Sequence, residues 1–351
     1  MSNVIALNVR PVRQPQHQRL AAHAQLFVSD RRAQGDVFWL KENAEFLNIA
    51  EATGQPGDPL LDHYEQIYDT IAERLGEFPQ YYRFFLSLCL DLEDLGMPGN
   101  TGATLCAWAH EHGLPQAELS DLQRGEAERL LARRGIAPPD PKLHARLMRF
   151  IDRSATFAIP NKKAAYELTH IVFYLSEYGR TDPQLSENAI QSLHFAGLLA
   201  YLDQNHDLLA EICVALRYAG QTPSDIWERA VLSALKNSWA EPVSVTPAFD
   251  DYHAYLVSSW LAGLCDDPVF PCILDSGPHR IAFEPPNARP LRELSRALED
   301  VRDSDWGRIR ERICERLDPQ EVSVLTAAEV STPAFDAFFE GFARASVPGR
   351  G

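Results

Sequence analysis

The sequence lacks several short motifs by which enzymes are most readily recognised. It contains no G-x-S-x-G nucleophile elbow, no P-loop, no G-x-G-x-x-G after a strand and no H-E-x-x-H zinc motif. Basic residues are also scarce, because 33 Lys and Arg stand against 49 Asp and Glu for a net charge of −16. The missing motifs weigh against the common hydrolase, nucleotide-binding and metalloprotease classes, and the negative charge weighs against binding to the phosphate backbone of a nucleic acid.

Paired cysteines and long apolar runs are absent as well. The six cysteines are scattered and form no C-x-x-C, so we expect reduced thiols. No stretch of about 18 apolar residues is present, and a chain without one is not expected to span a membrane. The first residues, MSNVIALNVRPVRQPQHQRL, contain no apolar segment of the length that a secretory signal needs. We therefore expect a cytoplasmic protein.

What the sequence does contain is helical periodicity along most of its 351 residues, with short connections between the periodic segments. Successive helices with short links fold back antiparallel. The predicted fold is all-α, with stacked helical hairpins in an α/α-toroid-like or solenoid arrangement and a small irregular Pro-rich insertion. We divide the chain into a flexible arm (1–14), an N-terminal helical region (15–135), a helical-hairpin body (142–265), the insertion (266–290), in which a small hairpin would fit, and C-terminal helices (291–351).

The strongest chemical lead lies in Asn161–Gly179, NKKAAYELTHIVFYLSEYG, which reads as one helix from Asn161 to a stop at Gly179. One narrow stripe of this helix is polar and the opposite face is apolar. Within the stripe, an E-x-x-H pair brings two ligand atoms to one point, as helical bundles do to hold iron or manganese. The pair could equally be an acid/base pair, or the stripe could be a solvated outer face. The polar stripe consists of Glu167, His170, Tyr174 and Glu177, with Tyr166 and Phe173 at its edges.

Two further helices add candidates. Asp207 and Glu211 lie one turn apart, although an acid at a helix start also interacts favourably with the helix dipole. Tyr252 and His253 open an apolar helix, where His253 is either a core histidine or part of a site. Because alternate helices of stacked hairpins face the same side, we expect the helices near 160, 207 and 250 to be inner and those near 184 and 224 to be outer.

These candidates combine into one predicted site on a concave inner surface. We assign catalytic and metal-binding roles to Glu167, His170 and His253. The metal would be divalent, with iron or manganese suiting two histidines and two or three carboxylates better than zinc. The remaining predicted binding residues are Asp207, Glu211, Tyr174, Glu177 and Tyr252.

Three segments, YELTHIVFYLSEYG, DLLAEICVAL and DDYHAYLV, resemble a bacterial family of unknown function. That family has a helix of the type ELTHxVFYxT(D/E)(F/Y)G, and Ser176-Glu177 stand here where Thr-Asp would be expected. A looser likeness is to the α/α-toroid group of terpenoid cyclases and protein prenyltransferases, in which a Tyr-His pair provides a zinc ligand. Tyr252-His253 and Glu211-Ile-Cys213 are similar to that pattern, but the D-x-D-D acid motif is absent. The looser likeness therefore implies the architecture and not the reaction.

Two functional hypotheses follow. The first is a cytoplasmic, metal-dependent enzyme of bacterial specialised metabolism that acts on a peptide or small molecule in a concave polar pocket. The alternative is a non-catalytic helical scaffold that binds a peptide or protein partner. The enzyme hypothesis predicts that His170 and His253 lie near each other in a cleft, whereas the scaffold hypothesis predicts dispersed histidines and an exposed apolar groove. Neither nucleic acid nor membrane is an expected partner, and no pattern predicts an oligomeric state.

Overall fold

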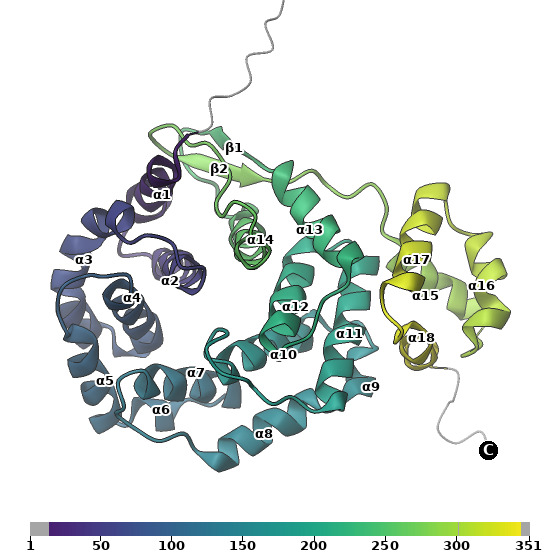
Figure 1. Cartoon of the computed structure of the whole chain (residues 1–351), viewed down its shortest axis with the longest axis horizontal. Coiled ribbons are helices and arrows are strands. Elements are labelled where there is room, and N and C mark those ends of the chain that lie inside the picture. Colours follow the sequence, from purple (N-terminus) through teal and green to yellow (C-terminus); the bar gives the residue numbers. More distant parts are fainter. Residues whose placement is uncertain (1–13, 301, 345–351) are drawn as a thin grey trace, which may run out of the picture.

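The computed structural model describes residues 14–300 and 302–344, so nearly all of the predicted flexible arm lies outside the described residues. Within these ranges the chain forms eighteen α-helices, two short helical turns of other types and two short strands (Figure 1). The predicted all-α class of helical hairpins is confirmed. None of the helices in the described part combines the length and the hydropathy required to cross a membrane.

Six helices form the inner layer of a ring (Figure 1). Each inner helix contacts the next inner helix in sequence, and these contacts bury the apolar faces that the sequence pattern predicts. The inner helices are α2 (Val37–Ala52), α4 (Tyr82–Asp94), α7 (Asp121–Ala132), α10 (Lys162–Leu175), α12 (His206–Tyr218) and α14 (Tyr252–Leu264).

The outer layer surrounds this inner ring, and its helices alternate with the inner ones along the chain. The predicted alternation is therefore present, since α10, α12 and α14 lie inside and α11 and α13 outside. The main outer helices are α1 (Gln16–Gln25), α3 (Asp58–Glu77), α5 (Thr101–Glu111), α8 (Pro141–Ile151), α11 (Glu187–Leu202) and α13 (Asp225–Lys236). The short connecting elements are η1 (Leu26–Asp30), η2 (Pro79–Tyr81), α6 (Leu114–Ala117) and α9 (Ser154–Phe157).

The series of inner helices closes on itself, because α14 contacts α2 as well as α12. Helices from both sides of the predicted boundary at 136–141 pack together, with α7 against α10 and α2 against α14. The boundary thus falls on the connection between α7 and α8, and the helices on its two sides belong to the same ring. The N-terminal region and the hairpin body share one inner surface.

The start of α10 matches the prediction and its end does not. The side chain of Asn161 accepts a hydrogen bond from the backbone N–H of Ala164 at 3.1 Å, which caps the first turn. The helix ends at Leu175, four residues before the predicted stop at Gly179. Glu177 and Tyr178 adopt positive φ angles of 46° and 53°, so the turn begins earlier than glycine alone would indicate.

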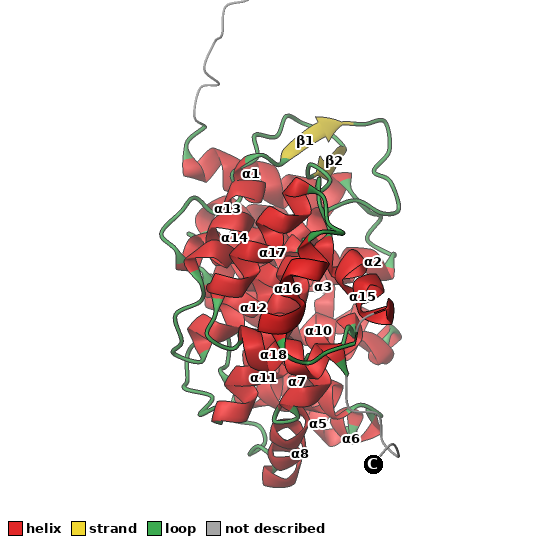
Figure 2. Cartoon of the chain, turned by 90° about the vertical axis from the view of Figure 1, so that its right-hand side faces the viewer, coloured by secondary structure: helices red, strands yellow, loops and turns green. Residues whose placement is uncertain are grey.

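The Pro-rich insertion is irregular, as predicted, but its described residues do not form a hairpin of their own. Its one strand, β2 (His279–Ala282), pairs antiparallel with β1 (Trp239–Pro242), which precedes α14. Figure 2 shows the two strands together at one end of the helical body. The remaining four helices lie outside the ring, and all but α16, which packs against α18, contact α11. They are α15 (Pro290–Asp300), α16 (Trp306–Cys314), α17 (Pro319–Ser331) and α18 (Phe335–Ala343).

Candidate functional site

Five titratable side chains from four inner helices meet at the inner surface of the ring. We call this group the acid–histidine cluster. The helix α2 contributes one carboxylate, α10 one histidine, α12 two carboxylates and α14 one histidine. The members are Glu45, His170, Asp207, Glu211 and His253.

The imidazole of His253 lies at the centre of the cluster. Its Nδ1 is 2.7 Å from Oδ1 of Asp207, and because a carboxylate accepts, Nδ1 carries the proton. Its Nε2 lies 3.7 Å from Oε1 of Glu45 and 3.7 Å from Oε1 of Glu211. Burial disfavours the charged ring, but Glu45, Asp207 and Glu211 outweigh it and raise the pKa of His253 to about 10. The ring is therefore an imidazolium at neutral pH.

The Glu211 carboxylate is buried, with 2% of its side chain exposed. Its Oε2 accepts a hydrogen bond from Oγ1 of Thr169 at 2.5 Å and lies 3.8 Å from Nδ1 of His170. Its Oε1 receives no hydrogen bond from the described residues. Burial raises the pKa of this carboxyl, while the nearby His170 and His253 oppose the rise. Glu211 thus has one oxygen held by protein donors and one available to a ligand.

His170 faces the same carboxylate from the other side. Its Nδ1 lies 2.7 Å from the carbonyl oxygen of Tyr166, which can only accept, so Nδ1 carries the proton in the neutral ring. The other nitrogen, Nε2, is then free to accept a proton, and 35% of the side chain is exposed. The hydroxyl of Tyr166 donates to Oδ2 of Asp207 at 3.0 Å. Tyr166 therefore contacts the cluster through Asp207, whereas the Phe173 ring packs in the core against Trp260.

The donor set fits a divalent cation. Ligand atoms of Asp207, Glu211 and His253 all lie within 4.8 Å of one another. Asp207 accepts the Nδ1 proton of His253, an arrangement that orients metal-binding histidines, and an ion bound at Nε2 would displace the second proton of the ring. Oε2 of Glu45 is buried without a hydrogen-bond partner, so a cation would satisfy an otherwise orphaned oxygen. The residues that could hold the ion are Asp207, Glu211 and His253, with Glu45 beside the histidine.

Four of the predicted residues lie apart from the cluster. Glu167 is half-buried and makes no hydrogen bond or ion pair with the described residues. Tyr174 and Glu177 turn toward α7, where Oε1 of Glu177 lies 3.2 Å from Nη1 of Arg129 and the Arg129 guanidinium lies 5.6 Å from the Tyr174 ring. Glu177 leaves the stripe because α10 ends at Leu175, before it. Tyr252 packs under the Arg31 guanidinium, 5.1 Å from its ring centroid.

Sequence reasoning missed two members of the site. Glu45 comes from α2, more than a hundred residues before the other members, and nothing near it in sequence points to them. Thr169 sits between the predicted Glu167 and His170, but its role as a donor to Glu211 depends on how α10 and α12 pack. One signal existed for Glu45: Glu42 and Glu45 lie one turn apart in a helix that is otherwise largely buried.

The cluster opens into a cavity of about 440 Å³. The walls come from the starts of α12 and α14, from Lys162 at the start of α10 and from the end of the insertion. Asp207 and His253 both line this cavity, so a molecule bound there would reach the cluster directly. Most of the other lining residues are polar or charged.

Fold and cluster together define an all-α protein of antiparallel helical hairpins with carboxylates and histidines on its inner surface. The chain belongs to the family described as a domain of unknown function (DUF6902), whose model matches residues 1–345. This agrees with the resemblance to a helical family without an assigned reaction. Neither a curated protein nor a solved structure matches the chain.

Proposed function

We propose that this protein is a cytoplasmic, metal-dependent enzyme of bacterial specialised metabolism that acts on a small molecule or peptide. The active site would be the acid–histidine cluster at the base of the 440 Å³ cavity. One observation carries the proposal: Asp207 holds Nδ1 of His253 while Nε2 lies between the carboxylates of Glu45 and Glu211. Three carboxylates around one imidazole favour positive charge, which the second proton of the ring supplies and which a divalent ion that displaces this proton would supply instead.

The ring of hairpins supports the proposal, and we propose that it is an α/α toroid. In such a ring, inner helices distant in sequence present side chains to a common interior. Rigid helices also hold a site more accurately than loops do. A bound divalent ion would act as a Lewis acid or lower the pKa of a water molecule.

In this proposal His170 is the general base. Its Nδ1 proton is committed to the Tyr166 carbonyl, so its free Nε2 can accept a proton from a substrate. Thr169 and His170 both contact Glu211, which orients that carboxylate toward His253. The geometry favours iron or manganese over zinc, because carboxylate oxygens dominate the donor set.

The alternative, a non-catalytic scaffold for a peptide or protein partner, predicts dispersed histidines. That feature is absent from the described residues, because His170 and His253 contact opposite oxygens of one carboxylate. The close approach of the two histidines favours the enzyme.

Metal binding by the full chain is the direct test. After treatment with a chelator, the protein is titrated with Mn²⁺, Fe²⁺ and Zn²⁺ in a calorimeter, and bound metal is measured by mass spectrometry. We expect one ion per chain, and Glu211→Gln should weaken binding at least about tenfold because it removes a ligand charge without changing shape. The matched control is Glu167→Gln, since this neighbouring glutamate makes no described contact with the cluster. Equal binding by wild type and Glu211→Gln, or none at millimolar ion, would reject the metal site.

A further inference from the structure

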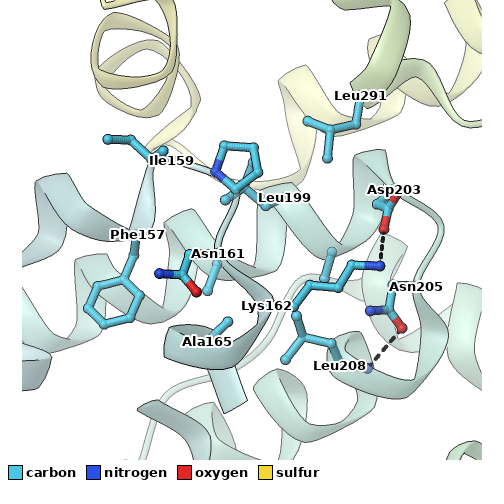
Figure 3. Close-up of a pocket in the computed structure, with 13 residues that line it drawn as sticks. Phe157, Ile159, Asn161, Lys162, Ala165, Leu199, Asp203, Asn205, Leu208 and Leu291 are labelled. Atoms are coloured by element: carbon cyan, nitrogen blue, oxygen red, sulfur yellow. Dashed lines mark hydrogen bonds and ion pairs between the residues drawn. The ribbon is translucent and has the colours of Figure 1, made fainter. Parts of the chain in front are cut away.

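The orientation of the Asp207 carboxylate is not fixed by its own helix. Asp207 lies in the first turn of α12, which Asn205 caps by accepting a hydrogen bond from the backbone N–H of Leu208 at 3.3 Å (Figure 3). The backbone N–H groups of His206 and Asp207 find no acceptor in the described residues. Because a carboxylate in a first turn is attracted to such free N–H groups, Asp207 has a competing partner in its own helix.

Two bonds from neighbouring helices engage the Asp207 carboxylate instead. The Tyr166 hydroxyl of α10 donates to Oδ2 at 3.0 Å, and Nδ1 of His253 in α14 donates to Oδ1 at 2.7 Å. Lys162 lines the same cavity, but its Nζ lies 2.8 Å from Oδ2 of Asp203, and Figure 3 shows this ion pair. Each oxygen of Asp207 thus has one donor, and Tyr166 provides one of the two.

Tyr166 contacts the cluster from the protein side. Its ring is half-buried and packs against the hydrophobic core. It also lies edge-on to the His253 ring, with the centroids 6.5 Å apart and the planes at 74°. Asp207 and His253 line the cavity, whereas Tyr166 does not. A molecule in the cavity would therefore meet Asp207 and not the tyrosine hydroxyl.

The same residue is bonded to both histidines of the cluster. The backbone carbonyl of Tyr166 accepts the hydrogen bond from Nδ1 of His170 at 2.7 Å, and its hydroxyl reaches His253 through Asp207. The carbonyl is part of the α10 backbone, whereas the hydroxyl is the last atom of the side chain. A substitution of the side chain can therefore remove the link to His253 and leave the link to His170 in place.

We propose that Tyr166 is a positioning residue of the candidate site and acts through Asp207. Its hydroxyl keeps the carboxylate turned toward α14, so that Oδ1 receives the Nδ1 proton of His253. The imidazole is then held with Nε2 between Glu45 and Glu211. This inference rests on the proposed function for the purpose of the site, but the bond between Asp207 and His253 is measurable without metal.

The first test is an NMR measurement of the His253 Nδ1 proton in the metal-free, full-length protein. A ring proton bonded to a carboxylate gives a slowly exchanging resonance at low field, which is assigned by its loss in His253→Gln. Tyr166→Phe removes only the hydroxyl and should speed exchange of this proton with solvent at least about tenfold, because Asp207 loses the bond that orients it. Unchanged exchange in Tyr166→Phe would overturn the proposal.

The second test is calorimetric binding of Mn²⁺, with thermal unfolding measured to show that each variant is folded. Tyr166→Phe should weaken binding about 10- to 100-fold, as the loss of a partner behind a metal ligand does. Incorporation of p-aminophenylalanine at position 166, which keeps a hydrogen-bond donor at the same place, should restore most of this affinity. The matched control is Tyr68→Phe, because the Tyr68 hydroxyl also donates to a carboxylate, that of Glu93 at 2.8 Å, outside the cluster.

Failure of this inference differs from failure of the proposed function. Faster exchange of the His253 proton in Tyr166→Phe, in a protein that binds no Mn²⁺, would overturn the metal site alone. Binding of Mn²⁺ that depends on Glu211, with exchange and affinity unchanged in Tyr166→Phe, would overturn the positioning role alone. Effects of Tyr166→Phe that p-aminophenylalanine does not reverse, or that Tyr68→Phe reproduces, would assign Tyr166 to packing and also overturn that role.

Discussion

Glu211 is the residue on which the candidate site depends, because it joins the two histidines. One of its oxygens faces His253, whose ring is charged, and the other faces His170 and Thr169. The two imidazoles differ because His253 is surrounded by carboxylates, whereas His170 donates to a backbone carbonyl. These surroundings support the two roles we propose, binding of an ion by His253 after loss of its Nε2 proton and acceptance of a proton by His170.

The raised pKa of His253 makes a pH dependence of stability testable. Its folded-state value of about 10 lies above the ordinary value of about 6.5, so the charged ring stabilises the fold fully below pH 6.5. This stabilisation is lost as the pH rises through 10. In urea unfolding with chelator present, the stability difference between wild type and His253→Gln should shrink from pH 6.5 to 10, by at most about 1.4 kcal/mol per pH unit.

Another buried histidine provides the contrast for this experiment. Burial lowers the pKa of His23 to about 4, so its contribution is present above pH 6.5 and is lost as the pH falls through 4. His23 therefore affects the pH dependence of stability below pH 6.5 and leaves the dependence above pH 6.5 unchanged. If the difference between wild type and His253→Gln stays constant from pH 6.5 to 10, the carboxylates do not hold a proton on His253.

Close helix packing sets the position of α12, which carries two members of the cluster. Gly197 of α11 lies where a Cβ atom would come within 2.5 Å of the Trp227 ring of α13 and 3.2 Å of Ile212 of α12. The glycine is therefore required for the approach of the three helices, although it has ordinary helical φ. A small residue at this point lets the outer layer press against the inner one.

Gly197→Ala should consequently destabilise the protein by about 1–3 kcal/mol, because the new methyl group would force the buried Trp227 ring to move. The matched control is Gly76→Ala in α3, where a Cβ atom meets nothing within 4 Å. At that position the higher helix propensity of alanine should stabilise the protein by up to about 1 kcal/mol. Urea midpoints measure both, and shifts of the same sign would contradict the packing argument.

The sequence predicts individual helices well where the signals are local. The Asn161 cap and the apolar face of α10 are local features, and both are present in the structure. The early end of α10 was missed because Glu177 and Tyr178 adopt positive φ, which their residue types do not favour. The pairing of β1 with β2 was missed because it joins segments on either side of α14, and Glu45 was missed because only tertiary packing brings α2 to α14.

A buried charge network joins the first and last inner hairpins. The Arg31 guanidinium is fully buried and lies 2.8 Å from both oxygens of Asp250 and 2.7 Å from Oε2 of Glu42. Oδ2 of Asp250 also accepts a hydrogen bond from the backbone N–H of Ile281 in β2. His253 follows Asp250 by three residues, so the same network holds the start of the helix that carries it.

Helical periodicity alone does not distinguish a closed ring from an open solenoid. Both arrangements bury the same apolar faces between neighbouring hairpins, so their sequences show the same pattern. The distinguishing contact joins Arg31 to Asp250, which are 219 residues apart. Each of these residues is unremarkable in its own segment, and only the three-dimensional arrangement pairs them.

Arg31→Ala should therefore lower the free energy of unfolding by more than the loss of any one surface ion pair does. It would leave Asp250 as a buried charge without its partner and Glu42 with Arg32 alone, and breaking a buried pair in this way costs about 3–5 kcal/mol. Arg280→Ala is the control, because Arg280 pairs with Glu241 at an exposed site where the expected cost is below about 1 kcal/mol. Urea unfolding followed by circular dichroism measures both variants. A cost for Arg31→Ala no larger than for Arg280→Ala would mean that the network does not hold the first and last hairpins together.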